Sequence, residues 1–337
     1  MPHGDGCGLG WGMQGLGPRH FLYDAPAMPA TPAVPTMPTT PDRPAAAALL
    51  QMQGLRFGYG PRALFDGLQA QIDRPGVYGL FGHNGSGKST LLKLLAGLLG
   101  PQAGQIRVLG QVPRQRRPQF LQQVYILPEE FHLPDLTPQQ LQRTHGGFYP
   151  QFDAALFAHC LQALQVPGAQ RFGGMSLGQK KKTALAFALA VRTPLLLLDE
   201  PTNGLDILGR SRFKELLMQP EQAGRTVLVS THQAHDLEQV LQHIWFLGQG
   251  RLLLDASMAE LGQRLRLGLA PAGQALPPGP PPIHQEAMGG HTVWLAARRP
   301  GEPAAPVPLE LLYKAISLNE AGVLAALQAP PAQEDAP

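Results

Sequence analysis

Residues 82–90 read Gly-His-Asn-Gly-Ser-Gly-Lys-Ser-Thr and match the phosphate-binding pattern GxxxxGK[ST], with Gly82, Gly87, Lys88 and Ser89 in the fixed positions. Glycines allow backbone N–H groups to approach phosphates closely, and the N-terminus of the helix that follows such a loop favours anions. Lys88 would add a positive charge at the β- and γ-phosphates, and the Ser89 hydroxyl is placed to bind Mg²⁺. The stretch therefore predicts a site for a nucleoside triphosphate.

The sequence on either side supports this interpretation. Residues 77–81 are apolar and predict a buried strand that leads into the loop, and residues 89–99 carry apolar side chains all round, as a buried helix does. The alternative is a glycine-rich turn that binds no phosphate. The order strand, loop, helix favours the nucleotide site.

A second element follows at residues 195–200. Leu195 to Leu198 form an apolar run that is too short to span a membrane and suits a central strand of a parallel sheet. Ligands bind at the carboxyl ends of such strands, where Asp199 and Glu200 stand. We expect Asp199 to hold Mg²⁺ and Glu200 to polarise the attacking water. The alternative is that two acidic residues merely end the strand.

Residues 175–179, Met-Ser-Leu-Gly-Gln, are similar to the signature sequence of ABC-type ATPases, and their distance ahead of the Asp-Glu-Pro-Thr-Asn-Gly-Leu-Asp run at 199–206 also fits. The chain resembles that family from about residue 50 to 268. The resemblance implies that Tyr59 stacks on adenine, that His232 senses the γ-phosphate and that Asp206 lies in a loop that crosses to a partner ATPase. It also places Glu129 where the family has glutamine, in a loop that links the nucleotide site to a membrane subunit.

The expected ligands are ATP and Mg²⁺. Catalytic roles are expected for Glu200, His232 and Lys88, and Mg²⁺ contacts for Ser89, Asp199 and Glu129. The residues expected to contact nucleotide, some of them on the partner's site, are Tyr59, Gly82, Asn84, Gly85, Ser86, Gly87, Lys88, Ser89, Thr90, Glu129, Ser176, Gly178, Gln179 and Asp206.

Several of these residues also have ordinary structural explanations. Tyr59 could be a strand aromatic, Ser176 and Asp206 could be helix N-caps, and His232 could be a surface histidine. Their joint order favours the functional interpretation. The Lys180–Lys182 run is interpreted as a solvated first turn of a helix and receives no role.

Two residues depart from the family pattern. Leu177 stands where the signature has glycine, and its Cβ limits close approach to a phosphate. Glu129 replaces an amide with a carboxylate that accepts but cannot donate a hydrogen bond.

Composition sets broad limits. The 337 residues carry 27 basic and 24 acidic side chains, a net charge of +3 that is too small to indicate nucleic-acid binding. Cys7 and Cys160 suggest no disulfide framework, so we expect a reducing compartment. No run of 18 apolar residues and no secretory signal are recognisable. We therefore expect a cytoplasmic protein that reaches the membrane through another chain.

Four regions are expected along the chain. Residues 1–48 form a Gly/Pro-rich extension with proline at every third position from Pro26 to Pro44; it is expected to be disordered, the alternative being a polyproline docking segment. Residues 49–268 form the ATPase domain and 269–290 a Pro-rich linker. Residues 291–337 form an accessory segment with a disordered end, or else a strand and helix that pack back on the core.

Within the ATPase domain, we expect half-exposed strands over 49–57, 69–72 and 106–109, helices over most of 118–190, and core strands near 195, 226, 244 and 252 with a hairpin turn at 247–251. Beyond the linker, residues 291–296 predict a strand and 309–327 a helix weakened by Gly322. The expected fold class is an α/β phosphate-loop NTPase, an ABC-type ATPase core with an antiparallel β subdomain and an α-helical subdomain.

The resemblance is nearest to exporter and antibiotic-resistance-type ABC ATPases. It implies the ATP-binding, ATP-hydrolysing subunit of a membrane transporter, with export favoured over import. The expected partners are transmembrane subunits on a separate chain and a second ATPase subunit, in a homodimer or a heterodimer, with no nucleic acid. One alternative is a soluble ABC ATPase that acts on a non-membrane complex. Another is a nucleotide-binding regulator with little turnover, which Leu177 and Glu129 would permit.

Overall fold

The structure, a computed structural model, describes residues 48–233, 237–299 and 301–328. The predicted extension, residues 1–48, lies outside the described residues except for its last position. Within the described residues, no helix is long and apolar enough to cross a bilayer.

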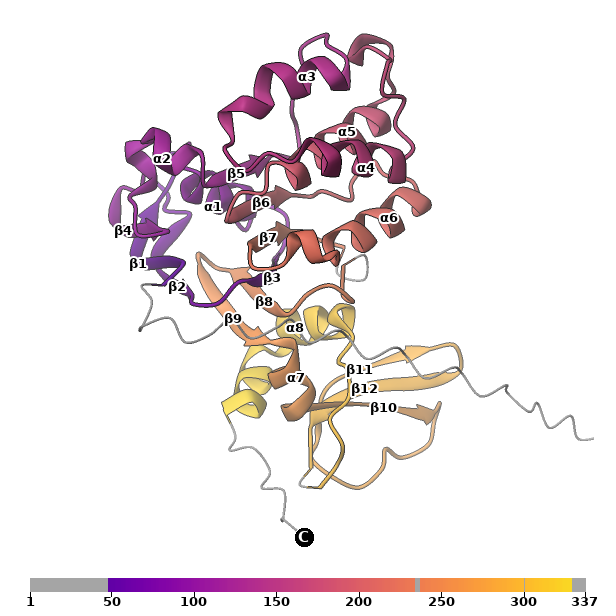
Figure 1. The fold of residues 1–337 in the computed structure, drawn as a ribbon. Coiled ribbons are helices and arrows are strands. Elements are labelled where there is room, and N and C mark those ends of the chain that lie inside the picture. Colours follow the sequence, from indigo (N-terminus) through magenta and orange to yellow (C-terminus); the bar gives the residue numbers. More distant parts are fainter. Residues whose placement is uncertain (1–47, 234–236, 300, 329–337) are drawn as a thin grey trace, which may run out of the picture. The chain divides into compact units, whose positions relative to one another are not determined.

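A six-stranded sheet in the order β5-β6-β7-β3-β8-β9 forms the centre of the fold (Figure 1). Its first five strands are parallel and β9 is antiparallel to β8. Every residue of β3, β6 and β7 is buried, which explains why these segments read as continuous apolar runs rather than alternating ones. The strands are β3 Gly76–Phe81, β5 Val124–Leu127, β6 Leu195–Asp199, β7 Thr226–Ser230, β8 His243–Gly248 and β9 Arg251–Ser257.

The predicted hairpin turn is confirmed between β8 and β9. Gln249 and Gly250 are its two turn residues, with φ of 51° and 75°. Positive φ at both positions is the geometry of the tightest hairpin connection. The turn matters below because both residues line a pocket beside the phosphate loop.

A smaller antiparallel sheet, β2-β1-β4, packs against helix α1, Lys88–Leu95. Buried and exposed residues alternate along most of β1, as predicted for a half-exposed sheet. β2 begins four residues before the predicted strand, and β4 ends one residue earlier than predicted. The strands are β1 Leu50–Phe57, β2 Phe65–Ile72 and β4 Ala103–Val108.

Helix α1 is shorter than the apolar run that predicted it. It ends at Leu95 instead of Leu99, because Gly97 turns the chain with a φ of 69°. A Cβ at Gly97 would lie 2.2 Å from the carbonyl oxygen of Pro113, so only glycine fits this turn. Leu98, beyond the helix, is half exposed.

The helical region predicted over 118–190 is confirmed by α2 to α5, but after α2 it contains a short strand, β5, that the sequence pattern did not indicate. β5 has four residues in a segment of mixed polarity, too short to show a period. Polar N-caps begin the longer helices: Thr137, Asp153, Ser176 and Asp206 each accept from the backbone three residues on. The helices are α2 Pro118–Leu121, α3 Pro138–His145, α4 Ala154–Ala163, α5 Leu177–Ala190 and α6 Ile207–Leu217.

The C-terminal part corrects two predicted boundaries. Residues 265–271 form a strand across the boundary expected at 268, and residues 282–288, inside the expected linker, form another. Both pair with the predicted strand at 291 in a sheet ordered β10-β12-β11. The prolines between residues 277 and 282 made this region resemble a linker. β11 nevertheless begins at Pro282, because proline is tolerated at the first residue of an edge strand. The elements are α7 Met258–Arg264, β10 Leu265–Pro271, β11 Pro282–Met288 and β12 His291–Ala297.

Helix α8, Leu309–Gln328, has an irregularity at Asn319 rather than at Gly322. Asn319 has φ −148° and ψ 62°, and its side chain accepts from the Gly322 N–H at 3.0 Å, so it caps the second half of the helix. Leu312 and Ile316 belong to the same buried cluster as Phe246 of the central sheet. The C-terminal strand and helix therefore pack back on the core, one of the two alternatives that the sequence left open.

The buried central strands predict the response to a core truncation. Leu197→Ala removes a side chain with 0% exposure from β6 and should lower the free energy of unfolding by about 2–5 kcal/mol. Leu318→Ala is the matched control, because Leu318 is 75% exposed. Thermal unfolding followed by circular dichroism measures both. Equal melting temperatures for the two variants would contradict the packing of β6.

Candidate functional site

The phosphate loop, residues 82–90, connects β3 to α1 and has the backbone that its glycines predict. Gly82, Gly85 and Gly87 have φ of 154°, 80° and 102°. A Cβ at Gly82 would lie 2.3 Å from the carbonyl oxygen of Leu247, and one at Gly87 would lie 2.7 Å from the Phe65 ring. The neighbouring elements therefore require glycine at both positions, and Asn84 and Gly85 remain exposed at the loop's tip.

Lys88 is nearly buried, with 8% exposure, and its Nζ is held by the loop itself. It donates to the carbonyl oxygens of Gly82 at 2.9 Å and His83 at 3.3 Å. Burial lowers the pKa of Lys88 from its ordinary value, and the nearby Glu200, Asp199 and Glu129 carboxylates offset part of that shift. A buried ammonium that faces several carboxylates can bind a polyanion together with a divalent cation.

Two further hydroxyl groups belong to the loop and the first turn of α1, those of Ser86 and Thr90. Thr90 bonds to the Tyr59 hydroxyl across 3.1 Å, which connects the loop to the segment after β1. Ser86 Oγ is buried and has no hydrogen-bond partner among the described residues. An unpaired buried hydroxyl is costly unless a ligand or water completes it, so Ser86 marks the loop as incomplete by itself.

Asp199 and Glu200 lie where β6 ends, as predicted. Asp199 pairs with Ser230 of β7 in the parallel register, and the Ser230 hydroxyl donates to its carboxylate. Glu200 has a φ of 45°, an uncommon conformation for a residue other than glycine, and its N–H donates to the Ser230 carbonyl at 3.0 Å. This geometry turns the chain sharply and places two acidic side chains at the carboxyl edge of the sheet.

The Glu200 side chain is bound on one side and open on the other. Its Oε1 lies 2.9 Å from Nδ1 of His232, which follows β7. Its Oε2 is buried with no hydrogen-bond partner among the described residues. A carboxylate with one oriented oxygen and one free oxygen can accept a proton from a water molecule.

Glu129 is positioned by hydrogen bonds with Asn203, in the run after β6, and with Lys181 of α5. Its Oε1 accepts from the side-chain amide of Asn203 at 2.9 Å, and its backbone carbonyl lies 3.4 Å from the Nζ of Lys181. Asn203 belongs to the run that follows Glu200, so Glu129 is connected with the carboxylate edge. An amide at position 129 would retain the acceptor that Asn203 uses.

Lys181 corrects the interpretation of Lys180–Lys182 as a solvated first turn, because α5 packs this side chain inside the protein. Its side chain is 4% exposed and lies over the Phe131 ring, with Nζ 5.5 Å from the ring centre. Burial lowers its pKa, with partial offset by Glu129, Asp199 and Glu200. The signal was its helical spacing, since Leu185 and Ala188 on the same face are apolar and buried.

Among the described residues, no hydrogen bond joins the signature residues Ser176 and Gln179 to the phosphate loop of this chain. Ser176 is the N-cap of α5, and its side chain and that of Gln179 bond each other's backbone in a capping box. Asp206 caps α6, lies 3.1 Å from Lys182 and has a lowered pKa because of these hydrogen bonds. The capping explanation is therefore correct for both residues. Leu177 beside them is 74% exposed.

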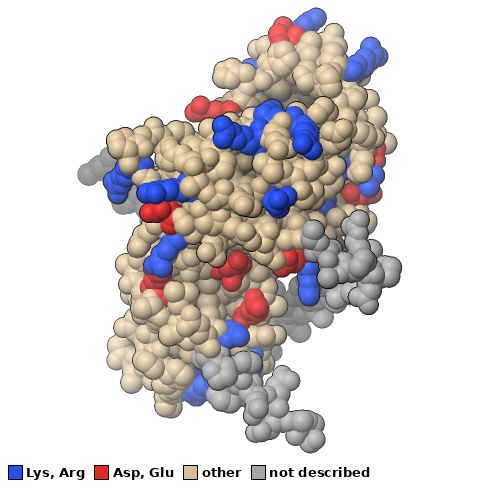
Figure 2. All heavy atoms as spheres, turned by 90° about the vertical axis from the view of Figure 1, so that its left-hand side faces the viewer, with Lys and Arg blue, Asp and Glu red and all other residues tan. Residues whose placement is uncertain are grey.

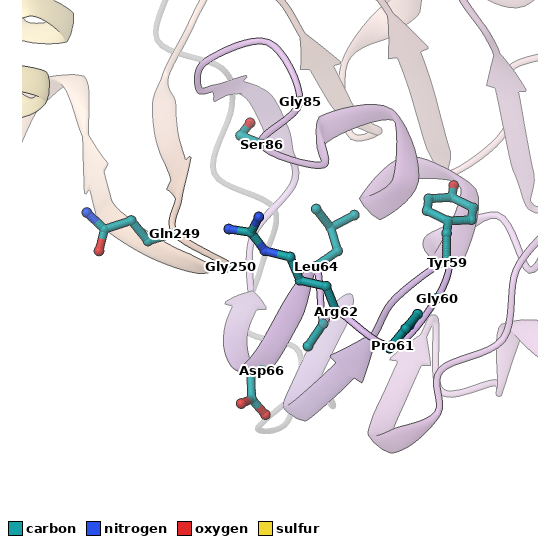
Figure 3. A pocket seen from close by; sticks show the side chains of 11 residues that line it. Tyr59, Gly60, Pro61, Arg62, Leu64, Asp66, Gly85, Ser86, Gln249 and Gly250 are labelled. Atoms are coloured by element: carbon teal, nitrogen blue, oxygen red, sulfur yellow. The ribbon is translucent and has the colours of Figure 1, made fainter.

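A pocket of about 900 Å³ lies beside the phosphate loop. Figure 3 shows its walls: Tyr59, Arg62 and Leu64 from the segment between β1 and β2, Gly85 and Ser86 from the loop, and Gln249 with Gly250 from the hairpin turn. Tyr59 is 69% exposed and its ring lies perpendicular to that of Phe57, so much of the Tyr59 ring is accessible to a ligand. Arg62, also not predicted, adds a cation to this pocket.

The residues present fit Mg²⁺ bound together with a triphosphate. Among the described residues, no three His, Cys, Asp or Glu side chains form a cluster that could hold a metal by itself. Mg²⁺ is ordinarily bound through one or two carboxylates, water and substrate phosphates, and Asp199 and Ser89 suit that mode. Bound there, the ion would neutralise charge that develops on the phosphates. Ser86 Oγ and Glu200 Oε2, both buried without a hydrogen-bond partner among the described residues, leave polar atoms for such a ligand.

Comparisons with known proteins agree with this geometry. Residues 65–203 match the family described as ABC transporter. The Nod factor export ATP-binding protein I of Cupriavidus metallidurans is 30% identical over 220 residues, which cover 64% of this chain and 73% of that protein. The bacitracin transport ATP-binding protein BcrA of Bacillus licheniformis is 28% identical over 215 residues, or 62% and 69% of the two chains.

A solved structure described as the ATP-binding subunit of an ABC transporter is also similar. It superposes with a TM-score of 0.58 at 25% identity and covers 63% of this chain and 91% of that one. The linearmycin resistance ATP-binding protein LnrL of Bacillus subtilis is 27% identical over 223 residues, or 64% and 72% of the two chains. The predicted fold class, an ABC-type ATPase core, is confirmed.

The buried ammonium gives the first prediction for the site. Lys88→Ala should abolish tight nucleotide binding, because the loop loses the one charge that its carbonyls hold in place. Lys93→Ala, on the same helix but pointing partly to solvent, is the matched control and should bind normally. Titration with a fluorescent ATP analogue measures both. Unchanged affinity in Lys88→Ala would contradict the site.

Proposed function

This chain belongs to the ABC transporter family of ATP-binding proteins, and from that premise we propose that its ATP hydrolysis powers a membrane transporter that exports its substrate. The observation that supports this most directly is the carboxylate edge, where Glu200 has one oxygen held by His232 and the other buried and free beside Lys88. Phosphoryl transfer to water needs charge neutralisation and positioning more than covalent chemistry.

ATP is proposed to lie along the pocket and the phosphate loop. The exposed ring of Tyr59 would stack on the adenine ring, and the backbone of Gly82, Asn84, Gly85, Ser86 and Gly87 would donate to the phosphates together with Lys88, Ser89 and Thr90. The pocket has both Tyr59 and Ser86 in its lining, which supports this placement.

Hydrolysis is assigned to the residues at the ends of β6 and β7. Glu200 would take a proton from the attacking water, while His232, bonded to Glu200, would contact the γ-phosphate. Ser89 and Asp199 are proposed Mg²⁺ ligands. Glu129 is proposed to act on Mg²⁺ through water, because its carboxylate already accepts from Asn203.

A second ATPase subunit is proposed to complete the site. The polar side chains of Ser176 and Gln179 bond each other's backbone, with no hydrogen bond to the phosphate loop of their own chain among the described residues. Lys182 of the same helix forms an ion pair with Asp206. We propose that Ser176, Gly178 and Gln179 face the γ-phosphate of a partner in a homodimer or heterodimer. The exposed Leu177 lies on this face, where its Cβ would restrict how closely the partner's phosphates approach.

The membrane subunit is proposed to bind the β5 groove, a groove of about 420 Å³ lined by residues that include Leu98, Arg116, Tyr125 and Phe148. Phe148 is 68% and Leu98 50% exposed, which is unusual for large apolar side chains. β5 runs from the groove directly to Glu129, so an occupant of the groove lies one strand from the nucleotide site.

The charge around the groove suggests what its occupant carries. Arg114, Arg116 and Arg117 are exposed in the segment before α2, and Figure 2 shows more Lys and Arg than Asp and Glu on the upper half of the face that includes this region. A cytoplasmic segment with apolar side chains and at least one carboxylate would complement it. This proposal places the chain at the cytoplasmic face of the membrane, through a separate transmembrane partner and without nucleic acid.

Export is proposed because the relatives include proteins named for Nod factor export and for bacitracin transport. The alternative is a soluble ABC ATPase that acts on a non-membrane complex. In that case a component of this complex, and not a membrane subunit, would bind the β5 groove. Purification of the tagged chain in mild detergent, followed by identification of what co-purifies, separates the two.

Hydrolysis can be separated from binding at Glu200. Glu200→Gln should keep nucleotide affinity but slow phosphate release by roughly 10²–10⁴-fold, the usual contribution of a general base. The amide can still bond His232, so the fold should be retained. Normal turnover by this variant would contradict the assignment of Glu200.

The groove can be tested without disturbing the core. Phe148→Ser should reduce co-purification of the membrane subunit while the isolated chain keeps its ATPase rate, since Phe148 is exposed. Leu269→Ser, at a residue with 63% exposure on β10, is the matched control. If both variants retain the membrane protein equally, the groove is not its binding site.

A further inference from the structure

Helix α8 contacts the phosphate loop through His83, one of the positions that the phosphate-binding pattern leaves open. The Tyr313 hydroxyl lies 2.8 Å from His83 Nδ1, and Ser317 Oγ lies 3.3 Å from His83 Nε2. Both ring nitrogens of a phosphate-loop residue are therefore bound by a helix about 230 residues later in the chain. This helix lies outside the matched family region, which ends at residue 203.

With a neutral imidazole, the hydrogen bonds of His83 have one consistent arrangement. Ser317 donates its hydroxyl proton to the carbonyl oxygen of Tyr313 at 2.8 Å, so toward His83 its oxygen must accept. His83 then carries its proton on Nε2, and Nδ1 accepts from the Tyr313 hydroxyl. Partial burial raises the pKa of Tyr313, which keeps that hydroxyl protonated and able to donate. The two contacts thus fix one tautomer and one orientation of the imidazole.

Aromatic packing supports the same position. His83, Tyr313 and Phe246 of β8 form a group of three rings, with centre-to-centre distances of 5.3 Å for His83–Tyr313, 5.1 Å for Phe246–Tyr313 and 6.3 Å for His83–Phe246. The pairs are tilted or edge-to-face, the arrangements that aromatic rings prefer. Tyr313 is therefore held by the core as well as by His83.

α8 is itself anchored on both sides. Leu312 and Ile316 are buried in the main core, and Lys314 binds both carboxylate oxygens of Glu286 on β11 at 3.0 Å. Asn319 donates to the Ile283 carbonyl, also on β11. α8 is thus fixed by contacts with both the core and the C-terminal sheet. The position of His83, which α8 contacts, depends on these contacts as well.

His83 matters because its carbonyl oxygen is part of the loop's internal bonding. It accepts from the Ser86 N–H at 3.0 Å and from Lys88 Nζ at 3.3 Å. A second contact of α8 lies beside the hairpin turn that lines the pocket, because Glu320 lies 3.0 Å from Arg251, the residue directly after that turn. No residue of α8 lines the pocket itself. α8 therefore contacts residues next to the pocket, His83 and Arg251, without being part of the pocket's lining.

We propose that Tyr313 and Ser317 are positioning residues for the phosphate loop: by holding His83 they keep the loop in the conformation that accepts nucleotide, so docking of α8 and nucleotide binding favour each other. The inference rests on the proposed binding of ATP at this loop. Coupling of this kind is reciprocal, so nucleotide in turn stabilises α8 against the core.

The direction of the effect follows from the geometry. A loop that is already ordered loses less conformational freedom when phosphates bind, so its affinity is higher. Tyr313→Phe removes the hydroxyl but keeps the ring packing, and the dissociation constant for nucleotide should rise about twofold to tenfold, the range for one neutral hydrogen bond. The maximal rate at saturating ATP should stay within about twofold, because Tyr313 does not line the pocket.

The experiment uses the full chain and a fluorescent ADP analogue, which is not hydrolysed. Dissociation constants are measured for wild type, Tyr313→Phe, His83→Ala and the double variant, with Tyr149→Phe in the β5 groove as the matched control. If Tyr313 acts through His83, Tyr313→Phe weakens binding in the wild-type chain and has no further effect in the His83→Ala chain. Ser317→Ala should show the same dependence on His83.

The outcomes separate the possible errors. Equal affinity in wild type and Tyr313→Phe overturns the positioning role while nucleotide binding stands, and tighter binding in the variant overturns it in favour of an inhibitory contact. The same loss in both His83 backgrounds shows a general structural effect instead of action through the loop. If the wild-type chain does not bind the analogue, the proposed binding of ATP at this loop is contradicted, and the inference about α8 falls with it.

Discussion

A buried ammonium that must be neutralised determines much of this structure. Lys88 is the first residue of α1, directly after the phosphate loop. It has 8% exposure, is held by two backbone carbonyls and lies near the carboxylates of Asp199, Glu200 and Glu129. Taking such a charge out of water is costly unless opposite charges compensate it. The carbonyls of a sharply turned loop and the acidic ends of neighbouring strands supply that compensation. The same arrangement accepts a polyanion with its metal ion, which links the stability of the loop to its chemistry.

The sheet supplies the positions for these groups. β3, β6 and β7 are adjacent and parallel, so the phosphate loop, the Asp199–Glu200 pair and His232 all follow strands that end at one edge. Ser230, opposite Asp199 in the register, bonds both the Asp199 side chain and the Glu200 backbone. The positive φ of Glu200 is maintained by that bond. Chemistry at this edge therefore depends on packing that is hidden in the core.

The sequence predicted the groups whose position follows from a local pattern. The glycines at 82 and 87, Lys88 and the apolar run before Asp199 each encode their environment within a few residues. The structure also confirmed the antiparallel sheet, the helical subdomain and the β8–β9 turn. The β8–β9 turn and the burial of the central strands follow from local pattern. The two subdomains were expected from the family resemblance, since β1 pairs with β4 more than 40 residues later in the chain.

What the sequence did not predict depends on distant contacts or on signals that are too short. Lys181 belongs to a basic run, and its burial against Phe131 depends on how α5 packs. The bonds of Tyr313 and Ser317 with His83 join residues about 230 positions apart. β5 has four residues, and β11 begins at a proline, so neither showed the pattern of a strand. The residues 269–290 that looked like a linker therefore contain part of the sheet that supports α8.

The central claim is that this chain hydrolyses ATP at a site that two copies or two related chains complete. The most direct measurement is the rate of phosphate release from Mg²⁺·ATP per mole of purified chain, determined over a wide range of chain concentration. The account predicts measurable release, with a rate per chain that rises with concentration and then levels off as the paired form becomes saturated. Release no faster than in protein-free buffer at every concentration would contradict it.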